Sequence, residues 1–85
     1  MYWEYRVITK DVGFGEFEQG IHEVRYSDEG EIISWRSIPV ELSWLIGENP
    51  RALVEEFLSA LEKPPLKIEW NVDDEEYVLV ELVSH

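Results

Sequence analysis

Two groups of adjacent residues have side chains that could do chemistry, His22-Glu23 and the acidic run Asp73-Asp74-Glu75-Glu76. A carboxylate beside an imidazole can orient it as a general base. Neighbouring side chains in a strand point to opposite faces, however, so His22 and Glu23 do not touch if they lie in a strand. We therefore expect a structural His22, either packed or partly exposed. His85 ends the chain and is predicted to be mobile.

The acidic run offers the oxygen ligands that Ca²⁺ and Mg²⁺ prefer. It lacks the 12-residue spacing and the central glycine of a calcium-binding loop. We interpret it as a solvated hairpin tip, with weak binding of divalent ions as the alternative. Two histidines, one of them terminal, do not predict a metal site, so no metal is expected.

Two further patterns have little specificity. Gly13-Phe14-Gly15 has neither the third glycine nor the lysine and following helix of a phosphate-binding loop. Serines that could be combined with His22 into a triad are present in any chain of this composition. We predict no catalytic residue, no cofactor and no enzymatic activity, and a small enzyme built on His22 remains the third alternative.

The charge is the most unusual property of the chain, because 19 acidic residues against 7 basic ones give a net charge of −12. The acids are spread over both halves of the sequence. Such a domain repels phosphate backbones and anionic lipid, and it meets basic surfaces faster. The predicted partner is a basic protein, with no direct contact to nucleic acid or membrane. The absence of cysteine and of an apolar N-terminal run favours the cytoplasm.

The elements that must position these residues are predicted from periodicity. A chain of 85 residues, 45% of them hydrophobic, predicts one folded domain over residues 1–85. Alternating apolar residues between turn signals predict five strands, over residues 2–10, 17–26, 31–38, 66–71 and 77–83. His22, Val24 and Tyr26 share one face of the second predicted strand. Gly30, just before the third, can take the positive φ of a turn. Residues 40–46 form either a short strand or an irregular loop.

The helix has clear boundaries in the sequence. Asn49 is the expected N-cap and Pro50 the first helical residue, and Pro64-Pro65 ends the helix at about Lys63. The side expected to face the sheet carries the apolar residues Leu53, Val54, Phe57, Leu58 and Leu61. The predicted fold class is α+β, in the order β-β-β-α-β-β, with an antiparallel sheet and one amphipathic helix packed on one face.

The aromatic residues exceed what one helix and one sheet face can bury. Four Trp, four Tyr and three Phe share a single small core, so some must face solvent. Exposed Trp and Tyr are typical of protein interfaces. The exposed aromatic residues therefore fit either self-association or binding to a foreign partner.

Part of the sequence resembles a known group of proteins. Tyr5-Arg6-Val7, Gly20-Ile21-His22-Glu23-Val24, Tyr26, Gly30, Trp35 and Leu58-x-x-Leu61-Glu62-Lys63-Pro64 are similar to a pattern in small acidic bacterial and phage-borne proteins. The resemblance covers about residues 2–66 and implies no activity. The layout of three strands, a helix and a strand also resembles HicB-type antitoxins, whose small domain covers a basic RNA-degrading toxin, although no DNA-binding segment follows the helix.

The main functional hypothesis is an acidic protein-binding module, acting as an inhibitor, an antitoxin-like cover or a nucleic-acid mimic. Carboxylates fixed on a rigid scaffold can imitate a phosphate array and steer a basic partner. The predicted partner-binding residues are Glu55, Glu56, Glu62, Asp73, Asp74, Glu75 and Glu76. The alternative is a structural homo-oligomeric domain, such as a homodimer, in which the acidity serves solubility.

Overall fold

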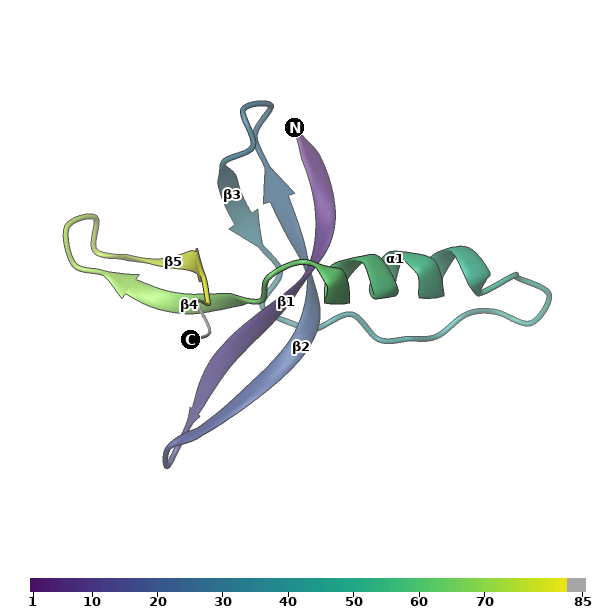
Figure 1. Cartoon of the computed structure of the whole chain (residues 1–85), viewed down its shortest axis with the longest axis horizontal. Helices are drawn as coiled ribbons and strands as arrows, with labels where there is room; N and C mark the ends of the chain where they lie inside the picture. Colours follow the sequence, from purple (N-terminus) through teal and green to yellow (C-terminus); the bar gives the residue numbers. More distant parts are fainter. Residues whose placement is uncertain (83–85) are drawn as a thin grey trace.

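A computed structural model describes residues 1–82 and gives five strands and one helix (Figure 1). The elements are β1 (Tyr2–Gly13), β2 (Glu16–Tyr26), β3 (Ile32–Trp35), α1 (Arg51–Glu62), β4 (Leu66–Asn71) and β5 (Glu76–Glu81). The α+β class and the order β-β-β-α-β-β are confirmed. Val83, expected to end the last strand, and His85 lie outside the described residues.

The strands form one sheet in the order β3-β2-β1-β4-β5. β1 pairs with β4 in parallel, through Ile8 with Leu66 and Thr9 with Lys67, whereas the other pairs are antiparallel. The predicted antiparallel sheet is therefore wrong at this pair, and the sheet is mixed. The long connection that contains α1 returns the chain beside β1, and such a crossover is what parallel pairing requires.

Two strands, β1 and β3, differ from the predicted lengths by three residues or more. β1 continues to Gly13, and β1 and β2 are joined by a tight turn with positive φ at Gly13, Phe14 and Gly15. β3 ends at Trp35, three residues early, because the segment leading to Pro39 does not continue the ladder. Residues 40–46 contain neither helix nor strand, so the irregular loop is the correct alternative.

Helix α1 begins and ends close to the predicted residues. Its N-cap is Pro50, one residue later than predicted, while the Asn49 side-chain Oδ1 still accepts a hydrogen bond from the Arg51 N–H at 3.0 Å. The C-terminal end of α1 lies near β1 and its N-terminal end extends away from the sheet (Figure 1). Contact with the sheet is therefore concentrated at one end of the helix.

Only part of the apolar side of α1 meets the sheet. The Phe57 ring packs edge-on against the Tyr5 ring of β1, with 5.2 Å between centroids, and Ala60 is buried. Val54, Leu58 and Leu61 are exposed, so the prediction that they face the sheet is wrong. β1 is the one strand that α1 contacts extensively, and a single strand is too narrow to cover a second row of helical side chains.

The main core is formed by side chains of neighbouring strands. Ile8, Val24, Tyr26 and Leu66 are buried together, and half-buried side chains of β3, β4 and β5 pack against them. His22, Val24 and Tyr26 share one face, as predicted, because all three are buried at alternate positions of β2. Tyr5 is on the opposite face of β1 from Ile8, since three positions separate them. Phe57 of α1 thus packs on the face that does not carry the main core.

The molecule is more open than its length requires. Its radius of gyration is 14.3 Å, against about 12 Å for a compact domain of 85 residues. Its accessible surface is 6652 Å², whereas a compact monomer of this size exposes about 5,300 Å². The helical arm and the β4–β5 hairpin extend to opposite sides (Figure 1). Within residues 1–82, α1 is too short and too polar to cross a membrane.

Candidate functional site

His22, the first candidate for chemistry, is buried inside the fold with 1% of its surface exposed. Its Nδ1 lies 2.8 Å from the Arg36 backbone carbonyl oxygen, and because a carbonyl only accepts, Nδ1 carries the proton. Burial lowers the pKa of His22, and the hydrogen bond to Arg36 opposes that shift in part. Glu23 lies on the other face of β2. His22 is therefore packed, which is one of the two placements predicted for it.

The acidic run occupies the tip of the β4–β5 hairpin, as predicted. Asn71 organises the turn, because its Oδ1 accepts from the Asp73 N–H at 3.0 Å and its Nδ2 donates to Asp74 Oδ2 at 3.1 Å. Asp73, Asp74, Glu75 and Glu76 are all exposed. No group of three potential metal ligands gathers anywhere within residues 1–82.

The acids of α1 lie far from this tip. Glu55, Glu56 and Glu62 are exposed on the helix, and the helix and the hairpin extend to opposite sides of the molecule (Figure 1). The seven predicted partner-binding residues therefore form two separate groups. Of the three helical acids, Glu56 lines a concave surface, while Glu55 and Glu62 do not.

That concave surface, here called the α1 groove, lies between α1 and the adjacent ends of β1 and β2. It has a volume of about 600 Å³. Its aromatic side chains are Trp3 and Tyr5 from β1, and its charged side chains are Glu4, Glu23, Arg36, Glu56 and Lys63, with the Ser59 hydroxyl beside them. The groove is thus built from the first strand, the second strand, the loop after β3 and the helix.

Two ion pairs border the α1 groove. Arg36 Nε lies 3.0 Å from Glu23 Oε2, and Lys63 Nζ lies 2.5 Å from Glu4 Oε1. Glu56 makes no ion pair with any residue in the described part of the chain. Burial, followed by the negative charges of Glu23 and Glu56, raises the pKa of Tyr5. The interior of the groove is therefore electronegative near the Tyr5 hydroxyl.

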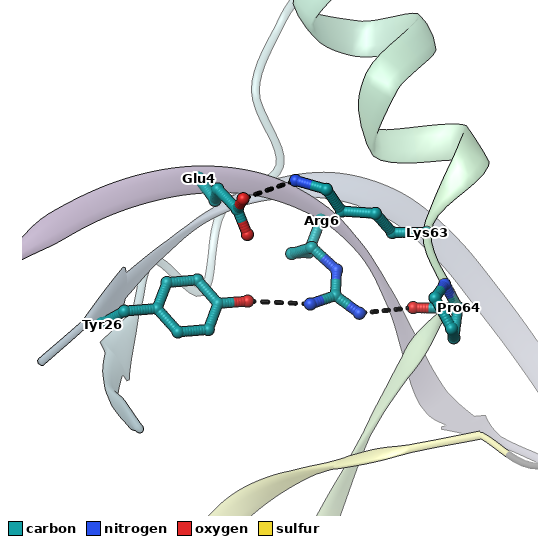
Figure 2. A network of polar contacts seen from close by, with 5 residues as sticks. All are labelled: Glu4, Arg6, Tyr26, Lys63 and Pro64. Carbon is teal, nitrogen blue, oxygen red and sulfur yellow. Dashed lines mark hydrogen bonds and ion pairs between the residues drawn. The ribbon is translucent and has the colours of Figure 1, made fainter. Parts of the chain in front are cut away.

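A buried guanidinium fixes the end of α1 beside this groove (Figure 2). Arg6 donates from Nη1 to the Tyr26 hydroxyl at 2.9 Å and from Nη2 to the Pro64 carbonyl oxygen at 2.7 Å. The Lys63–Glu4 ion pair lies next to these bonds (Figure 2). Together these contacts join the C-terminal end of the helix to β1 and hold one wall of the groove in place.

A second uncovered surface lies on the helix itself. Val54, Leu58 and Leu61, called here the outer stripe, are 37%, 53% and 61% exposed. Their spacing of four and three residues puts them on one side of α1. Several aromatic side chains also face solvent, as predicted, among them Trp3, Trp44 and Trp70, each about half exposed.

Sequence reasoning named one residue of the α1 groove as a partner contact, Glu56. It missed Trp3, Tyr5 and Arg36 as parts of a site. Trp3 and Tyr5 stand at alternate positions of the sequence, which is typical of side chains on one strand face. No local signal places the Arg36 side chain over Trp3. Comparison with protein-family models, with curated proteins and with solved structures finds no match for the chain.

Proposed function

We propose that this chain is a non-enzymatic protein-binding domain that docks onto a basic partner protein through the outer surface of α1. The observation that carries the proposal is the outer stripe, because three large apolar side chains on one helix side have no covering element. An uncovered apolar stripe of this kind is typical of a contact surface. Its neighbours on the helix determine which partner it suits.

The surroundings of the outer stripe are acidic. Leu58 is three residues after Glu55 and four before Glu62, so both carboxylates flank it on the helix surface. With 100° between successive helical residues, Glu55 and Glu62 lie between the outer stripe and Glu56. The outer stripe, the carboxylates of Glu55 and Glu62 and the α1 groove therefore follow one another around the helix. A partner that combines apolar and basic side chains would complement this surface.

The net charge distinguishes between two kinds of partner for the outer stripe. A basic protein is favoured over a second copy of the chain because two copies, each with a charge of −12, repel one another.

The arrangement of the acids favours one version of the binding hypothesis. A nucleic-acid mimic needs carboxylates in a continuous array, whereas the acids of α1 and of the hairpin tip lie on opposite sides of the molecule. An inhibitor or antitoxin-like role, in which α1 covers part of a basic protein, needs only the helical group. We place this function in the cytoplasm, in keeping with the absence of cysteine.

The alternative is a homodimer in which the outer stripes of two copies meet. The same uncovered side chains support it. The repulsion between two acidic chains opposes it at low ionic strength. The oligomeric state of the purified chain separates the two proposals.

The test begins with capture at low ionic strength from the native cells, followed by purification of the captured protein and calorimetry of the reconstituted pair. We expect a basic partner bound with defined stoichiometry and with an affinity that falls as salt rises. Leu58→Gln should weaken the reconstituted complex at least tenfold. Val72→Gln, at an exposed apolar residue of the hairpin tip, should leave it unchanged.

Two results would contradict the proposal. A reconstituted complex that tolerates Leu58→Gln as well as Val72→Gln would show that α1 is not the docking surface. A stable dimer of the purified chain in sedimentation at low salt, dissociated by Leu58→Gln, would favour the homodimer instead.

A further inference from the structure

We propose that the α1 groove is a binding site for an arginine side chain, which the basic partner supplies when it docks on α1. This inference rests on the proposed function for the source of the arginine. The recognition chemistry itself depends only on the residues of the groove, so it can be tested without the partner.

The aromatic wall already attracts guanidinium groups of the chain itself. The Arg36 guanidinium carbon lies 5.8 Å from the centre of the Trp3 ring, and that of Arg25 lies 6.0 Å from it. Arg36 also pairs with Glu23 at 3.0 Å while its side chain is 69% exposed. One end of the groove therefore holds an arginine in the way that we expect for an incoming one.

The other end of the groove has an acid without a cation. Glu56 lines the groove and makes no ion pair within residues 1–82. The raised pKa of Tyr5 reflects the charges of Glu23 and Glu56 as well as burial. The charges of both carboxylates therefore act on the Tyr5 hydroxyl. Ser59, one turn after Glu56 on α1, adds a hydroxyl acceptor to this end.

This combination favours a guanidinium over an ammonium. A guanidinium is planar and weakly hydrated, so it can stack on Trp3 or Tyr5 while it forms paired hydrogen bonds to a carboxylate. A lysine ammonium is a compact and strongly hydrated charge that gains less from such a wall. The volume of about 600 Å³ lies within the range of small-ligand sites and accommodates the aliphatic stem.

The walls of the groove are held in position before any ligand arrives. Lys63 is joined to Glu4, and the carbonyl of Pro64 accepts from the buried Arg6 (Figure 2). Phe57 packs on Tyr5 beneath the helix. Because α1 and β1 are already fixed to each other, binding need not order them, which lowers its entropic cost.

The direct test is a titration of the isotopically labelled full chain with N-acetyl-L-arginine amide, followed by NMR. We expect saturable shifts of the Trp3 indole N–H and of the Ser59 amide at millimolar ligand. N-acetyl-L-citrulline amide has nearly the same shape without the charge and should produce no saturable shift.

Variants locate the site. Glu56→Gln should weaken arginine binding about fivefold, the typical loss for one partly exposed charged contact. Glu69→Gln is the control, because it removes the same charge from an exposed position on β4 outside the groove, and binding should stay within twofold of the parent. Arg36→Gln should strengthen binding several-fold, since it frees Glu23 and removes one of the two guanidinium groups that lie over the Trp3 ring.

Three outcomes would overturn the inference. The absence of saturable shifts would remove the site, and equal effects of Glu69→Gln and Glu56→Gln would reduce it to unspecific attraction. Tighter binding of putrescine than of the arginine derivative would assign the groove to free polyamines. None of these results depends on the capture experiment, so the docking proposal for the outer stripe can fail or succeed separately.

Discussion

The Arg6 guanidinium on β1 donates to the Pro64 carbonyl oxygen at 2.7 Å, across 58 residues of sequence. The same group donates to the Tyr26 hydroxyl from its other terminal nitrogen. One buried side chain therefore joins β1, β2 and the segment that follows α1. The helix has few other buried contacts, so its position on the sheet depends strongly on this residue.

Arg6→Lys should lower the free energy of unfolding by about 1–3 kcal/mol, because a single ammonium cannot reach both acceptors with the geometry of a guanidinium. Urea denaturation measures this loss. Arg51→Lys, at the exposed start of α1, is the control and should change stability by less than about 0.5 kcal/mol. Equal stability of the two variants would show that the Arg6 bonds do not hold the helix.

Lys63→Met should destabilise the chain by about 0.5 kcal/mol at low salt, since its ion pair with Glu4 is about one-third exposed and partly screened. The loss should shrink in 1 M NaCl, where the screening length is about 3 Å. Lys67→Met removes the same charge from β4, where Lys67 faces the Phe17 ring, and provides the comparison. A salt effect of the same size in both variants would mean that overall charge is responsible.

The buried His22 should make stability depend on pH near neutrality. Because its pKa is lowered in the folded chain, the unfolded chain binds a proton first as pH falls below about 6.5. Stability is therefore full above that pH and decreases below it, by at most about 1.4 kcal/mol per pH unit.

Urea midpoints of the parent and of His22→Gln, measured from pH 7.5 to 5.5, test this dependence. The parent should lose stability more steeply, and the difference between the two curves isolates His22 from the carboxylates. If the urea midpoints of the two proteins fell equally with pH, the pKa of the buried imidazole would not be lowered.

The acidic charge should keep copies of the chain apart. At micromolar concentration and low salt, sedimentation should show a monomer, because the net charge of −12 produces repulsion between copies. In 1 M NaCl this repulsion is screened, and the outer stripes should then promote self-association. Leu58→Gln should remain monomeric at both salt concentrations. An association that weakens as salt rises would exclude this account.

Much of the fold follows from local sequence signals. Asn49-Pro50 and Pro64-Pro65 delimit α1, and alternation delimits β2 and β4 to within a residue or two. The parallel pairing of β1 with β4 could not be predicted. Ile8 and Leu66 have the same pattern whichever strand lies beside them, so the choice depends on the path of the whole connection.

The outer stripe and the α1 groove were less predictable, because they too depend on the tertiary arrangement. Helical spacing shows that Val54, Leu58 and Leu61 share a side with other apolar residues, but it does not show whether a sheet is wide enough to cover them. The α1 groove combines Trp3, Arg36 and Glu56 from segments far apart in sequence. Only the tertiary arrangement brings such residues together. The sequence predicted Glu56 alone among them, as an acidic partner-binding residue.

The parallel junction between β1 and β4 has a kinetic consequence, because it consists of two residue pairs, Ile8 with Leu66 and Thr9 with Lys67. The β1–β2–β3 meander closes through short loops and should fold early. The pairing of β1 with β4 joins residues that the whole crossover separates in sequence, so it should form later. The β4–β5 hairpin should therefore dock last. In native-state hydrogen exchange it should also open as a unit before the meander does.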